Sequence, residues 1–134
     1  MSMIIKKITP KYQDIPSTIR KRIVRDLDNA YYPVSWLVPY IQIVHDRAQV
    51  ELMRGCPHSC NFCQARNIYQ NVRLRSPEKV KDLIDKVLKN TGYEEISLLS
   101  LSTSDYPYLN DIIDSISRQC SDKAIAISFP SLRP

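Results

Sequence analysis

No apolar run in this chain of 134 residues approaches the ~20 residues that a membrane-spanning helix needs. Residues 1–7 also lack the long apolar stretch and the cleavage site of a secretory signal. We therefore expect no membrane partner and a cytoplasmic location, in which cysteines stay reduced. The hydrophobic content of 43% and the charged content of 25% are typical of a soluble globular chain, with one small domain at most.

Acidic residues are missing from one central stretch. Between Arg54 and Arg75 there is no Asp or Glu, although Arg66 and Arg73 also lie there and the whole chain carries a net charge of +5. Positive charge favours thiolates and anionic groups nearby. A solvated basic loop is the simple alternative. A nucleic-acid surface is a weaker one, because aromatic residues are not interleaved with these arginines.

A fourth cysteine is missing from the same stretch. Cys56, Cys60 and Cys63 follow a strand-like run with the spacing C-x3-C-x2-C. Iron–sulfur clusters normally take four cysteines, so three would leave one iron open to another ligand. Structural zinc bound by these cysteines and His58 is an alternative, although zinc sites usually combine two ligand pairs and no second pair exists. Free thiols are the third possibility.

The spacing of the three cysteines favours a loop over a helix. In a helix, Cys56 and Cys63 would lie about 10 Å apart along the axis at ~1.5 Å per residue, too far for one small cluster. Gly55 and Pro57 flank Cys56 and interrupt regular structure. The remaining cysteine, Cys120, lies two elements further along and is expected to be a small buried hydrophobe rather than a fourth ligand.

Apolar periodicity predicts alternating strands and helices after a poorly patterned start. Ser76 and Pro77 are a helix start, and Gly92 is the expected end of that helix. The predicted elements are a helix over 18–27, a hairpin of strands 40–44 and 48–53, a helix that begins at Pro77 and is stopped by Asn90-Thr91-Gly92, a strand over 96–101, a helix from Asp105 or Pro107, and a strand over 124–129. The βαβαβ order from residue 48 onward predicts an α/β fold with parallel strands and right-handed crossovers.

The cysteine motif, with Phe62 before its last cysteine, resembles the signature of the radical S-adenosylmethionine superfamily. Several blocks resemble the subgroup that carries an N-terminal cobalamin-binding domain: Arg54-Gly55-Cys56, Asn61-Phe62-Cys63-Gln64-Ala65, Ile68-Tyr69, Val72-Arg73, Arg75-Ser76-Pro77-Glu78, residues 97–106 and Pro130-Ser131-Leu132-Arg133. The resemblance implies a TIM-like (βα)6 barrel, of which residues 38–134 are the N-terminal βαβαβ part and residues 1–37 an extension. We therefore expect the chain to be a fragment, or one piece of a split protein whose remaining barrel half is a separate chain.

The resemblance also implies the chemistry. Cys56, Cys60 and Cys63 would hold a 4Fe–4S cluster whose open iron binds S-adenosylmethionine. Reductive cleavage would give a 5′-deoxyadenosyl radical that acts on an unknown substrate. A reductant protein of the flavodoxin or ferredoxin type is implied. Cobalamin is possible, but its domain is absent from this sequence. The alternatives are a zinc-stabilised Cys3His binding module and a non-catalytic remnant.

Five further residues that contact S-adenosylmethionine follow from the same resemblance. Phe62 would lie against the adenine. The methionine amino group would be contacted after the second strand, where the common Gly-Gly-Glu pattern is missing, by backbone carbonyls or by the Ser102 and Thr103 hydroxyls. Ser131 and Arg133 would contact its carboxylate or the ribose, because the forked donors of arginine suit a carboxylate. A core position for Phe62 and helix capping by Ser104 or Asp105 are the structural alternatives. Pro57-His58-Ser59 and Arg66 depart from the subgroup pattern without removing a ligand.

Overall fold

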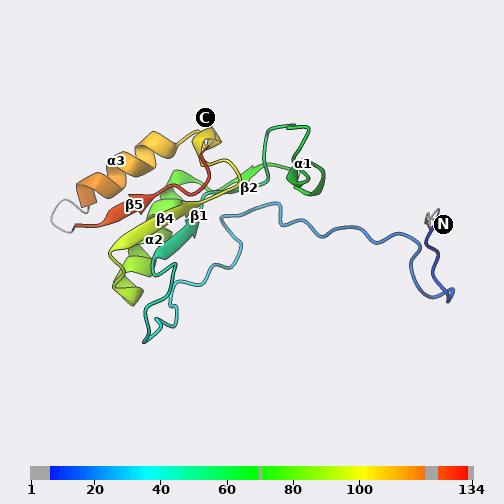
Figure 1. The fold of residues 1–134 in the computed structure, drawn as a ribbon, viewed down its shortest axis with the longest axis horizontal. Helices are drawn as coiled ribbons and strands as arrows, with labels where there is room; N and C mark the ends of the chain where they lie inside the picture. The colour runs from blue at the N-terminus through cyan, green and yellow to red at the C-terminus, as the bar shows by residue number, and fades with distance from the viewer. Residues whose placement is uncertain (1–6, 70, 120–123, 133–134) are drawn as a thin grey trace.

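The computed structural model describes residues 7–69, 71–119 and 124–132. It is an α/β arrangement in which three parallel strands form a sheet in the order β1-β4-β5 (Figure 1). The elements in chain order are β1 (Ala48–Glu51), β2 (Met53–Arg54), α1 (Ala65–Ile68), β3 (Arg73–Leu74), α2 (Pro77–Thr91), β4 (Glu95–Leu99), the 3-10 helix η1 (Thr103–Asp105), α3 (Leu109–Gln119) and β5 (Ala126–Ser128).

The parallel sheet confirms the βαβαβ order. Helix α2 connects β1 to β4 and helix α3 connects β4 to β5, and each of these strand pairs is parallel. The two helices contact each other, so both lie on the same face of the sheet. A tight turn would make the next strand antiparallel. Consecutive parallel strands therefore need a long crossover connection, which these helices provide.

Helix α2 begins and ends where its local signals predict. The Ser76 hydroxyl accepts a hydrogen bond from the Lys79 amide at 3.2 Å, and Pro77 occupies the first turn. Gly92 ends the helix with φ +74°, and its amide donates to the Leu88 carbonyl. These are the two devices that satisfy the unpaired backbone groups at helix ends.

The hydrophobic core lies between the sheet and the two helices. Its buried members come from three strands, both helices and two connecting positions (Leu52 and Tyr106), and they are Ala48, Val50, Leu52, Met53, Val80, Leu83, Ile84, Val87, Ile96, Leu98, Tyr106, Ile112 and Ile116. Helix α3 begins at Leu109 rather than at Asp105 or Pro107, because η1 and a further turn take up residues 103–108. Its buried positions are Ile112, Ser115 and Ile116.

Two predictions for the N-terminal part are wrong. Residues 18–27 are not helical, and Ile19, Ile23 and Val24 are 89%, 41% and 41% exposed. Short helices are marginal unless an apolar face packs on something, and this segment has no such support. Residues 40–44 are not a strand either. Strand β1 takes β4 as its neighbour, so the predicted hairpin does not form.

The N-terminal segment is tied to the core at residues 27–36. Leu27 is buried, and its carbonyl accepts a hydrogen bond from the buried guanidinium of Arg75. The Tyr32 hydroxyl donates to the Gln49 carbonyl of β1. Before these contacts the chain runs away from the sheet as a long path (Figure 1). The division of the chain at residue 38 stays a prediction.

In the described part of the chain, no helix is long and apolar enough to cross a membrane.

Candidate functional site

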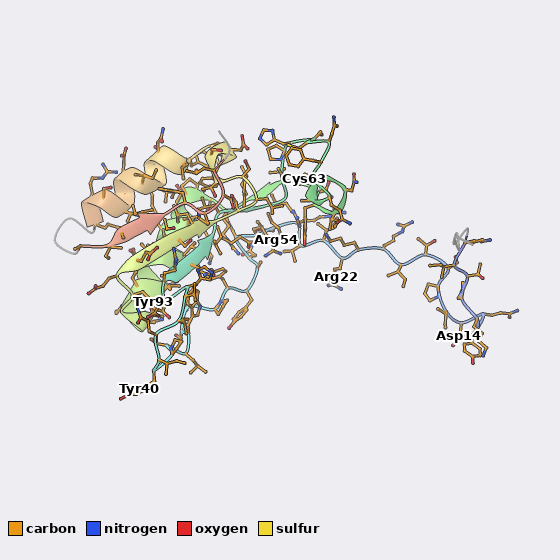
Figure 2. The ribbon with its side chains drawn as sticks, in the orientation of Figure 1. Asp14, Arg22, Tyr40, Arg54, Cys63 and Tyr93 are labelled. Carbon is orange, nitrogen blue, oxygen red and sulfur yellow. The ribbon has the colours of Figure 1, made fainter. Side chains whose placement is uncertain are left out.

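The three cysteines lie in a loop that leaves the sheet after β2. Strand β2 follows the carboxyl end of β1 and pairs with β3 in an antiparallel ladder, so residues 55–72 form an excursion closed at its base. Figure 2 shows Cys63 on this excursion. Ligand sites of parallel α/β folds lie at the carboxyl ends of the strands, and this loop lies at that edge.

Gly55 makes the tight entry into the loop possible. Its φ of +98° is in a region that L side chains rarely adopt, and a Cβ built on it would lie 2.5 Å from the Asn71 carbonyl oxygen. One residue later, the Cys56 amide donates to the Tyr69 carbonyl at 3.2 Å. The two arms of the excursion therefore touch where the first cysteine enters.

Cys56, Cys60 and Cys63 are all free thiols and partly accessible. The Cys63 amide donates to the Cys60 carbonyl at 3.1 Å, which forms a turn between these two. Among the described residues, no three His, Cys, Asp or Glu side chains are gathered as a metal-binding group. The donor set still fits an iron–sulfur cluster, because three soft ligands lie on one loop without regular structure between them.

Phe62 is 93% exposed, so the core alternative for this side chain is wrong. An aromatic ring held in solvent next to two cysteines has no packing role within the described residues. The adenine contact stays a prediction.

The predicted residues after β4 and β5 come together. Ser102 and Thr103 are buried, and the Thr103 amide donates to the Ser131 carbonyl at 2.7 Å. The Thr103 hydroxyl lies 2.9 Å from the Ser100 hydroxyl. These residues therefore belong to one polar cluster at the carboxyl ends of two neighbouring strands. Arg133 and Cys120 lie outside the described residues.

A side-chain contact joins the cysteine loop to this polar cluster. Nε2 of His58 lies 2.5 Å from Oδ2 of Asp105, and the same oxygen accepts a hydrogen bond from the Ser102 hydroxyl at 2.5 Å. The side chains of His58 and Asp105 are 30% and 31% exposed. Asp105 appeared in the sequence only as a possible helix cap. A contact across 47 residues leaves no local sequence signal.

A second carboxylate, Glu51, lies at the end of β1. It forms a two-pronged salt bridge with Arg54, with both N–O distances 2.8 Å, and its Oε2 lies 3.3 Å from the buried Arg75. Burial alone would raise the pKa of Glu51. The hydrogen bonds and charges of Arg54 and Arg75 outweigh burial and hold the pKa below its usual value. Glu51 therefore neutralises part of the basic stretch from just outside it.

A hollow of about 390 Å³ opens between the ends of β1 and β4. Glu51, Arg54 and Gly55 line one side, and Leu99, Ser100 and Leu101 line the other. Met53 and Tyr69 complete it. The hollow thus adjoins the entry of the cysteine loop and the first residues after β4.

Comparison with known proteins identifies relatives of the whole described core. Residues 50–134 match the model of the Radical SAM superfamily. Over 98% of its length, the chain is 25% identical to an uncharacterized protein of Methanocaldococcus jannaschii, 31% of which is covered.

Other relatives carry two named activities. The chain is 30% identical to the anaerobic magnesium-protoporphyrin IX monomethyl ester cyclase of Cereibacter sphaeroides, over 59% of the chain and 14% of the cyclase. It is 26% identical to the tRNA-2-methylthio-N(6)-dimethylallyladenosine synthase of Staphylococcus epidermidis, over 86% of the chain and 27% of the synthase. The chain therefore spans less than a third of the length of each of these relatives.

Proposed function

Because the chain belongs to the radical S-adenosylmethionine superfamily, whose cofactors are a 4Fe–4S cluster and S-adenosylmethionine, we propose that Cys56, Cys60 and Cys63 hold that cluster. The observation that carries the proposal is the position of three free thiols on one loop at the carboxyl edge of a parallel sheet. Three thiolates leave one iron for a ligand that is not a cysteine. When bound, this pair of cofactors supplies reductive cleavage of the sulfonium, which starts hydrogen abstraction from a substrate.

The residues after β4 and β5 bind the amino-acid end of S-adenosylmethionine in this proposal. Ser102, Thr103 and Ser131 form one polar cluster across two strand ends, which suits an ammonium and a carboxylate. Arg133, outside the described residues, would supply a charged donor for the carboxylate in this proposal. The His58–Asp105 contact holds the cysteine loop next to this cluster, so both halves of the cofactor site keep one relative position.

Phe62 covers the adenine in this proposal. Its ring is exposed beside Cys63, so a flat ligand can stack on it without displacing a protein group. The hollow beside Gly55 provides adjacent space for the ribose or a substrate.

We propose that the described sheet is the first part of a TIM-like (βα)6 barrel. Sequential parallel strands with both helices on one face are the arrangement of such barrels. The substrate stays open, because the relatives with named activities include a porphyrin ester cyclase and a tRNA-modifying synthase. A flavodoxin or ferredoxin type of reductant, a separate chain for the other barrel half, a cytoplasmic location and any use of cobalamin stay predictions.

Anaerobic reconstitution with iron and sulfide tests the cluster. We expect about four irons and four sulfides per chain. The Cys60→Ala variant should lose them, whereas Cys120→Ala, the matched control outside the loop, should keep them. One zinc and no sulfide per chain would contradict the proposal.

Two further measurements separate the alternatives. His58→Ala should keep its iron, since only a Cys3His zinc site needs that imidazole as a ligand. When the reconstituted chain is mixed with S-adenosylmethionine and a chemical reductant is added, 5′-deoxyadenosine should be released. A cluster without that product would indicate a non-catalytic remnant.

A further inference from the structure

A basic groove lies between the N-terminal segment and the distal arm of the cysteine excursion. It consists of two adjoining hollows of about 350 Å³ and 420 Å³ that share Lys21, Ile23, Asn71 and Arg73. The other residues that line the groove are Arg22, Val24, Arg25, Arg54, Asn67, Ile68 and Tyr69. Five of these eleven side chains are cationic, and no described Asp or Glu lines either hollow.

Two cations hold the walls of the groove together through neutral partners. The Lys21 ammonium donates to the Ile68 carbonyl at 2.8 Å and lies 4.2 Å from the centre of the Tyr69 ring. The Arg73 guanidinium donates to the Val24 carbonyl at 3.0 Å. Neither contact cancels a charge, so the groove is preformed and keeps its positive potential.

Two other cations are available for a ligand. Arg22 and Arg25 are exposed, and in the described part of the chain neither has a hydrogen bond or an ion pair. Figure 2 shows Arg22 on the N-terminal segment, outside the sheet that carries Arg54. Arg54 differs from these two because Glu51 neutralises it.

A concave surface lined by one sign of charge concentrates counter-ions. The forked donors of arginine bind phosphate oxygens in pairs, and several cations spread over two segments suit a ligand with more than one phosphate. We propose that this groove binds a ligand that carries several phosphates, either a free nucleotide or an RNA strand.

The groove also adjoins the cysteine loop. Tyr69 forms part of its wall and accepts the hydrogen bond of the Cys56 amide through its carbonyl. A phosphate ligand held there would therefore lie next to the entry of that loop. No cysteine takes part in the binding itself, so the proposal can fail or succeed independently of the cluster.

The test uses the full chain and a short fluorescent single-stranded RNA, with pyrophosphate as competitor and, by calorimetry, as a direct ligand. The variant Arg22→Gln/Arg25→Gln removes the two available cations without removing a wall contact. The control Lys86→Gln/Lys89→Gln removes the same charge from the exposed face of α2. Thermal unfolding of both variants checks that the fold is unchanged.

We expect the groove variant to bind roughly tenfold more weakly than the control at low salt, with a salt slope shallower by about 1.4 for two lost phosphate contacts. RNA binding that pyrophosphate does not displace would identify a strand as the ligand. Direct pyrophosphate binding that competes with RNA would identify a nucleotide. No saturable binding of either probe, or equal weakening in both variants, would overturn the proposal.

Discussion

At the scale of single residues, Gly55 is the position at which the loop is most sensitive. The variant Gly55→Ala places a methyl group 2.5 Å from a backbone oxygen and forces an unfavourable φ, so something must shift. Left-handed strain alone costs on the order of 1–3 kcal/mol. Gly92→Ala is the matched control, because its φ is also positive but nothing lies within 4 Å of the added atom.

Urea unfolding of the two glycine variants measures this difference. We expect Gly55→Ala to lower the free energy of unfolding more than Gly92→Ala does. Equal decreases in the free energy of unfolding would show that the loop makes room for the added methyl group near Asn71 without further loss of stability.

His58 is the other single residue with a specific expectation. His58→Ala removes the hydrogen bond between the cysteine loop and Asp105, and a hydrogen bond of this kind contributes about 1 kcal/mol to holding the loop in place. Under the proposed function, the dissociation constant for S-adenosylmethionine should rise about fivefold, since 1.4 kcal/mol corresponds to tenfold. Calorimetric titration of the reconstituted protein measures it.

The second histidine provides the control for that experiment. His45 lies in an exposed turn, and His45→Ala should bind S-adenosylmethionine like the unchanged chain. Loss of iron in His58→Ala would instead identify the imidazole as a metal ligand.

At the scale of elements, helix α2 depends on its first turn. Ser76→Ala removes the hydroxyl that accepts from the Lys79 amide, and losing such a cap costs about 1 kcal/mol. Ser76→Thr retains the acceptor and should restore most of the stability. Urea unfolding midpoints of the two variants test this, and equal midpoints would mean that Pro77 and the tertiary contacts determine the helix start.

At the scale of the whole molecule, Glu51 joins β1, β2 and, through Arg75, the N-terminal segment. Because the pKa of Glu51 is lower in the folded chain than in the unfolded chain, its carboxylate stabilises the fold above the unfolded value of about 4.3. That stabilisation is lost as the pH falls through the folded pKa.

The variant Glu51→Gln isolates this contribution. We expect it to be less stable than the unchanged chain at pH 7, with the difference shrinking as the pH falls below about 4.3 and disappearing once the pH is below the lowered folded pKa. Free energies of unfolding measured in urea across this range test the expectation. A difference independent of pH would show that packing, and not the charge, is what the substitution removes.

Much of the fold was predictable because its signals are local. Ser76, Pro77 and Gly92 mark both ends of α2 within one turn, and the alternation of strands and helices implies parallel pairing. The helix over 18–27 was wrong because its apolar face has nothing to pack on among the described residues, and the hairpin was wrong because β1 pairs with the more distant β4 and residues 40–44 form no strand. Apolar spacing forms a helix only when its face is covered, and β1 could pair with either neighbour until the crossover placed β4 beside it.

The candidate site likewise has a part that the sequence predicted and a part that only the structure revealed. The spacing of Cys56, Cys60 and Cys63 determined by itself that three soft ligands share one loop, and it carried the resemblance that the family match later supported. Only the tertiary structure decided that Asp105 meets His58, that Glu51 also meets the buried Arg75, and that Arg22 and Arg25 line a groove with Arg73. These pairings join side chains brought together by topology, and a distant neighbour leaves no trace in local sequence.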